Sequence, residues 1–140
     1  MLADVHQRLL SATPQLVEVR VAESLAALDA GTRPRSGTVF VIPYREVARP
    51  SPVTTGGFRQ QVTVQVIVAF VIRSHADAKG AARAAEFEGV KTVIEGALAG
   101  WEPPSATAPL ELVTGDAEPG TNGETVYAQV WQTTRFLTGA

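Results

Sequence analysis

The chain has 140 residues, a net charge of −2 and no cysteine. The lack of cysteine excludes disulfides, cysteine-ligated zinc, iron–sulfur clusters and thiol catalysis, and the charge balance gives no general basic surface for nucleic acid. Hydrophobic residues make up 45% and charged residues 19%, which is ordinary for a globular protein although slightly poor in charge. A chain of this length can bury one core, so we expect a single domain. The N-terminal residues lack the apolar run of a signal peptide, so we expect synthesis in the cytosol.

The first third of the chain predicts two helices and two strands. Apolar residues recur at helical spacing over residues 2–10, and Thr13-Pro14 ends that pattern. Alternation over residues 16–21 predicts a short strand, and residues 22–30 predict a second helix. A β-branched run over residues 37–44 predicts a strand that leaves its sheet at Pro43. The proline- and glycine-rich residues that follow predict a long exposed loop or arm.

Residues 57–74, GFRQQVTVQVIVAFVIRS, hold the longest apolar run, which is too short and too interrupted to cross a membrane. Alternation from Gln61 to Ile72 predicts one long strand. One face of this strand is apolar throughout, whereas the other is polar at first and apolar from Ile67. We therefore expect the second half to be covered on both faces and the first half to project as a hairpin arm.

The second half of the chain predicts one long helix and two strands. Residues 74–100 predict the helix, with Ser74 as its cap and Gly100 at its end. Residues 110–113 predict a short strand, and a loop is expected from Thr114 to the turn at Asn122-Gly123, before the last strand over residues 124–137. The order predicts an α+β fold over residues 1–140. A largely antiparallel or mixed sheet of four to five strands carries helices on one face, with a projecting loop or arm around residues 45–60.

No constellation of residues indicates catalysis. The two histidines, His6 and His75, are expected at the surface or at a helix cap. The acidic residues Asp116, Glu118 and Glu124 do not follow the pattern of a calcium loop and are expected in a solvated turn. No phosphate-binding loop and no nucleophile elbow are present. We expect no enzyme, no cofactor and no metal site.

The predicted arm carries the best candidates for a contact surface. Its arginines lie near an aromatic residue, and on a net acidic chain this favours a protein contact over nucleic acid. We expect the segment to reach a neighbouring molecule and to be mobile in the isolated subunit. Trp101 and Trp131 are expected as core or interface anchors. The candidate interface residues are Arg45, Glu46, Arg49, Phe58, Arg59, Gln61, Thr63 and Gln65.

A series of short motifs resembles, in order and spacing, that of the tail terminators of long-tailed bacteriophages. The resemblance covers nearly the whole chain, and GWEP at residues 100–103 is its sharpest element. Trp131 stands where a phenylalanine is more usual. The other matching features are FVIP at residues 40–43, Gly56-Gly57, Gln61, Arg73, Asp77, Gly80, Pro109-Leu110, Gly115, Tyr127 and Thr133.

The resemblance implies a structural virion protein. Members form a hexameric ring that caps the tail tube, ends its polymerisation and provides the interface for head–tail joining. The implied partners are identical subunits in a ring of six, the tail tube protein and a head-completion or neck protein, with DNA only as passing cargo and no membrane. The implied location is the neck region of the virion tail, and the host cytoplasm during assembly. Two alternatives stay open, namely another neck or head-completion ring protein and a small bacterial ligand-binding module.

Overall fold

The computed structural model describes residues 1–12, 16–24, 34–52, 56–73, 81–119 and 123–139. The elements are α1 (Leu2–Leu10), β1 (Glu18–Val21), β2 (Thr38–Ala48), β3 (Phe58–Ile72), α2 (Ala81–Leu98), β4 (Glu111–Pro119) and β5 (Thr125–Gly139). The strands form one five-stranded sheet in the order β1-β2-β3-β5-β4. β1 and β2 are parallel and the other pairs are antiparallel, so the predicted single α+β domain with a mixed sheet is confirmed.

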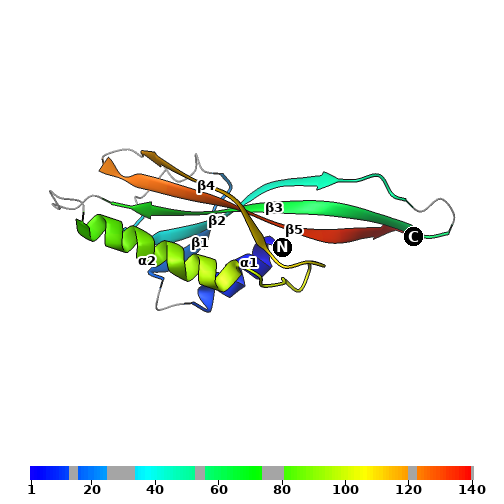
Figure 1. Cartoon of the computed structure of the whole chain (residues 1–140), viewed down its shortest axis with the longest axis horizontal. Coiled ribbons are helices and arrows are strands. Elements are labelled where there is room, and N and C mark those ends of the chain that lie inside the picture. The colour runs from blue at the N-terminus through cyan, green and yellow to red at the C-terminus, as the bar shows by residue number, and fades with distance from the viewer. Residues whose placement is uncertain (13–15, 25–33, 53–55, 74–80, 120–122, 140) are drawn as a thin grey trace.

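Both helices pack on one side of the sheet, which we call the helix face (Figure 1). The apolar side of β3 supplies Val66, Val68, Phe70 and Ile72 to this core. The predicted long helix is confirmed over its described part, Ala81–Leu98, and its apolar residues pack against this core. The helix ends at Leu98 and is followed by Gly100 in the left-handed conformation, as expected of a C-terminal cap. The helical core residues are Val5 and Leu9 of α1 and Val90, Ile94 and Leu98 of α2.

The opposite side of the sheet, which we call the back face, carries a second apolar cluster. Ile67, Ala69 and Val71 of β3 are buried there together with Phe40 and Ile42 of β2. Earlier on the strand, Gln61, Thr63 and Gln65 are only partly buried. The predicted change of the back face from polar to apolar at Ile67 is therefore confirmed.

β2 does not end near Pro43, and the prediction that it leaves the sheet there is wrong. The strand continues to Ala48, with a shift in its pairing to β3 between Pro43 and Arg45. Tyr44 is the extra residue of this bulge, and a bulge tolerates proline because it interrupts the regular ladder. Pairing then resumes between Arg45 and Gln65.

β4 is also longer than predicted, because it continues to Pro119 where a loop was expected from Thr114. All nine of its residues are exposed, so the strand has no alternation of apolar and polar residues from which to predict it. Gly115 has a packing role within β4, because an added Cβ would lie 2.1 Å from the hydroxyl oxygen of Tyr127. The predicted last strand is confirmed as β5.

Three strands continue beyond the helices along the long axis of the molecule (Figure 1). We call this part the extension and define it as residues Tyr44–Ala48 of β2, Phe58–Gln65 of β3 and Thr133–Gly139 of β5. β3 is its middle strand and pairs with β2 and β5 on either side. α2 and β4 lie along the other half of the molecule (Figure 1).

Some sequence predictions fall outside the described residues. These are most of the second helix predicted over residues 22–30, the cap at Ser74, His75 and Asn122. Neither described helix is long and apolar enough to cross a membrane.

Candidate subunit interface

All eight predicted interface residues lie in or directly beside the extension. Arg45 and Glu46 are on β2, whereas Phe58, Arg59, Gln61, Thr63 and Gln65 are on β3. Arg49 follows the end of β2, and its backbone N–H donates to the carbonyl of Gln61 at 3.0 Å. The structure therefore brings these residues onto one three-stranded surface, although not onto one face of it.

The back face of the extension carries a chain of polar side chains that crosses three strands. Nε of Arg45 donates to Oε1 of Gln65 at 2.8 Å, and Nε2 of Gln65 donates to Oε1 of Gln132 at 2.8 Å. Gln65 is the central member, since it is paired in register with both other residues. The chain gives the Arg45 side chain a neutral partner, and Arg45 forms no ion pair with a described residue.

Nearer the tip, the back face presents a cation on an aromatic ring. The guanidinium carbon of Arg59 lies 3.9 Å from the ring centroid of Phe136. Such a contact attracts the cation to the ring without neutralising its charge. Phe136 is 37% exposed, so the pair is available to another molecule.

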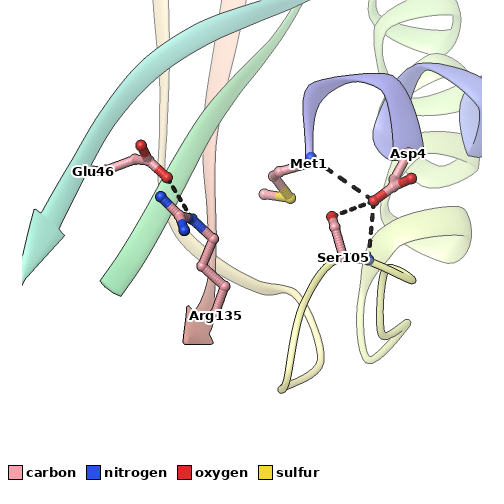
Figure 2. Close-up of polar contacts among 5 residues, drawn as sticks. All are labelled: Met1, Asp4, Glu46, Ser105 and Arg135. Carbon is pink, nitrogen blue, oxygen red and sulfur yellow. Dashed lines mark hydrogen bonds and ion pairs between the residues drawn. The ribbon is translucent and has the colours of Figure 1, made fainter. Parts of the chain in front are cut away.

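The helix face of the extension carries an ion pair above two valines. Nε of Arg135 on β5 lies 2.9 Å from Oε1 of Glu46 on β2, and the pair crosses over β3 (Figure 2). Val62 and Val64, the β3 residues opposite Arg135 and Glu46, are only 4% and 7% exposed. The ion pair therefore contributes a polar cover to the apolar side of the extension.

Exposed apolar side chains surround these polar contacts. Both faces of the extension show them, which is unusual for a part of a protein that contacts only water. Sequence reasoning found Phe58 and missed the others, because their strand register was unknown. The exposed large apolar residues of the extension are Tyr44, Val47, Phe58, Phe136 and Leu137.

A groove of about 370 Å³ lies where the extension joins the helical half. It is lined by Met1 and Leu2 of the first turn, by Pro43 and Tyr44 at the bulge, and by neighbouring residues of β3 that include Val66. The lining is mostly apolar, so the groove can accept an apolar side chain of another molecule.

The described residues hold no group of three or more histidines or carboxylates placed to bind a metal ion. Asp116 and Glu118 lie exposed on β4 and not in a turn. Glu124 is 7% exposed, and its Oε1 lies 3.2 Å from Nε of Arg73, so the prediction of a solvated position for it is wrong. Trp131 is a core residue, as predicted, at 1% exposure.

A chain in the virion of a native gene transfer agent (GTA) particle has a similar fold. The two chains align with a TM-score of 0.62 at 13% sequence identity, over 99% of this chain and 95% of that one. At this identity the likeness shows that the two chains share a fold. A search of curated protein sequences finds no match.

The chain belongs to the phage tail terminator protein family, whose model matches residues 2–139. This confirms the resemblance found in the motifs. The protein is therefore a structural protein of a phage tail.

Proposed function

We propose that the protein forms a ring of six identical subunits that caps the tail tube and ends its polymerisation. The same ring provides the interface to a head-completion or neck protein, and DNA passes through it only as cargo. The family match over residues 2–139 supports this role, and the observation that carries it is the extension, with its exposed aromatic residues and with arginines that form no ion pair with a described residue.

A closed ring needs a heterologous interface, in which one patch of a subunit meets a different patch of the next. The extension is suited to be one of these patches because it stands clear of the helices at one end of a long molecule (Figure 1). Its middle strand from Phe58 to Gln65 spans about 26 Å at ~3.3 Å per residue. We propose the eight predicted residues, together with Tyr44, Val47 and Phe136, as the surface that contacts the neighbouring subunit or the tube.

The oligomeric state and the tube contact are tested together. Light scattering and negative-stain images are expected to show a closed ring of six, in solution or at the ends of purified tail tubes. With tubes present, the protein is expected to bind one end and to stop elongation when more tube protein is added. Binding to the head side without any effect on elongation would instead favour a neck or head-completion protein.

A small ligand-binding module makes a different prediction. It would stay a monomer or dimer, would not bind tail tubes, and would melt at a higher temperature with a ligand.

A double variant, Phe136→Ser with Tyr44→Ser, tests the proposed contact surface. Both side chains are exposed, so their loss is expected to weaken assembly with little effect on the melting temperature.

A further inference from the structure

The two outer edges of the sheet offer open backbone to another chain. β4 is the last strand of the order β1-β2-β3-β5-β4, and no described strand pairs with its outer edge. At the other side, β1 pairs with β2 only from Thr38 to Val41, so in the described chain the outer edge of β2 has no strand beside it in the extension. An open strand edge is a template for pairing with a further strand.

β4 carries side chains that suit a protein contact. Leu112 and Val113 are 46% and 44% exposed beside the shift in its pairing with β5. The strand also carries the carboxylates of Glu111, Asp116 and Glu118, and none of them forms an ion pair with a described residue. The edge is therefore partly apolar and acidic, and the described residues supply no cation to pair with its carboxylates.

The arginines of the extension carry the opposite charge. Arg45 is bonded to the neutral Gln65, and Arg59 lies over Phe136. Neither they nor Arg49 form an ion pair with a described residue. The exposed apolar residues on this edge are Tyr44 and Val47. Three arginines thus lie at one end of the molecule and three carboxylates on a strand along the other half, and none of them forms an ion pair with a described residue (Figure 1).

Strand register places the two sets of charges on the same face of the sheet. Glu111, Asp116 and Glu118 are paired with Gln132, Ala128 and Val126 of β5. Those three residues are opposite Gln65, Ala69 and Val71 of β3, which belong to the back face. Arg45, opposite Gln65, shares that face. Alternation places Arg49, which follows Ala48 opposite Val62, and Arg59 of β3 on the same face. Strands added side by side present the same face together, so these charges can form cross-strand pairs.

We infer that β4 of one subunit lies beside the outer edge of β2 in the extension of the next, with Arg45 and Arg49 facing the acidic side chains of β4. The inference rests on the proposed ring and identifies both halves of its interface. Residues Tyr44–Arg49 span about 20 Å and β4 about 30 Å at ~3.3 Å per residue, so the shorter edge fits within the longer one. Adjacent strands are rotated by about 20–25°, so each added subunit turns in the same sense, as closure requires.

Two charge-reversal variants and their mixture test this contact. One carries Asp116→Lys and Glu118→Lys, and the other carries Arg45→Glu and Arg49→Glu. Each variant alone is expected to lose rings, because like charges then meet at every interface. An equimolar mixture is expected to recover them with the two variants alternating, because each interface again joins opposite charges. The readouts are light scattering, ring images with or without tubes, and mass spectrometry of the ring composition.

Controls separate a lost contact from a lost fold and from a lost function. Glu88→Lys reverses one charge at an exposed site on α2, and is expected to keep the rings. All variants are expected to melt at the wild-type temperature.

The outcomes distinguish the inference from the proposed function. If the wild type and each charge-reversal variant alone form rings, the inference is overturned and the proposed function stands. The inference is also overturned if each variant alone forms no rings and their mixture does not recover them. Wild-type protein that neither forms rings nor binds tubes would overturn the proposed function itself.

Discussion

Arg135 and Glu46 join the two outer strands of the extension across the strand between them. Nε of Arg135 lies 2.9 Å from Oε1 of Glu46, although β5 and β2 do not pair with each other (Figure 2). Glu46→Gln is expected to lower the free energy of unfolding by about 0.2–1 kcal/mol, because both side chains are partly exposed and screened. The loss is expected to shrink in high salt, as measured by urea unfolding. Glu88→Gln, which breaks an exposed pair on α2, is the matched control. A loss that does not change with salt would argue against an electrostatic contribution.

The close approach of Gly115 and Tyr127 leads to a prediction about packing. Gly115→Ala places a Cβ against the tyrosine hydroxyl and is expected to cost about 1–3 kcal/mol of folding free energy. Tyr127→Phe in the same chain is expected to restore part of that loss, because it removes the nearest atom. Gly89→Ala, in the exposed middle of α2 with no atom in the way, is instead expected to stabilise by up to about 1 kcal/mol. Thermal unfolding of the four chains tests the order. A Gly115→Ala chain as stable as the wild type would show that Tyr127 moves away freely.

Polar side chains bonded in series hold the buried Trp131 in place. Nε1 of Trp131 donates to Oε1 of Gln129 at 3.2 Å, and Nε2 of Gln129 donates to Oε2 of Glu95 at 2.9 Å. Gln129→Leu leaves the indole N–H without this acceptor and is expected to cost about 1–3 kcal/mol. The same change is expected to cost less in a Trp131→Phe chain, which has no N–H to satisfy. Equal costs in the two backgrounds would show that the hydrogen bond contributes nothing.

Asp4 makes the stability of the folded protein depend on pH. The hydrogen bond from the Ser105 hydroxyl, with smaller help from the Ser105 N–H and the N-terminal amine, holds the pKa of Asp4 below its ordinary value, although burial opposes the shift (Figure 2). A carboxylate with a lowered folded pKa stabilises above the unfolded value of about 3.9, and this contribution is lost as the pH falls through the folded pKa. Asp4→Asn is therefore expected to be less stable than the wild type at pH 6, with the difference closing below about pH 4. Urea unfolding across pH 2–7 measures this difference in stability. Ser105→Ala is the variant that removes the hydroxyl, which is the main partner of Asp4. A constant difference at all pH values would exclude this titration.

Hydrogen exchange tests the order of the extension. The sequence suggested mobility of this segment in the isolated subunit, whereas in the structure the residues from Val62 to Gln65 pair with strands on both sides. We therefore expect slow exchange for the middle strand and faster exchange for the open edge of β2. Fast exchange throughout residues 58–65 would show that the strand pairs open readily in the subunit.

The long strand and the main helix could be predicted because each has one apolar face. In β3 the alternation is unbroken from Val62 to Ile72, and α2 repeats apolar residues at Val90, Ile94 and Leu98. β4 could not be predicted in full, because a strand whose every residue is exposed has no apolar period. The end of β2 was misplaced because proline ordinarily ends a strand, whereas a bulge accommodates it here.

Only part of the candidate site could be predicted from the sequence, for a related reason. Arg45, Phe58 and Arg59 stand out in the sequence by type and by their neighbours. Arg135 and Phe136 do not, since their place beside Glu46 and Arg59 depends on the register between β3 and a strand about 70 residues later. Local sequence carries no information on such a distant pairing.

β3 and β5 pair without interruption from Phe58–Gly139 to Ile72–Thr125, through the extension and on into the core. A force applied along these strands at the tip is opposed by shear of the whole ladder, in which many hydrogen bonds are strained at once. A force across the strands would open the ladder one bond at a time. The extension is therefore stiff to tension along its length and compliant to peeling from its tip, so that a load on the tip along the strands is passed directly to the core beneath the helices.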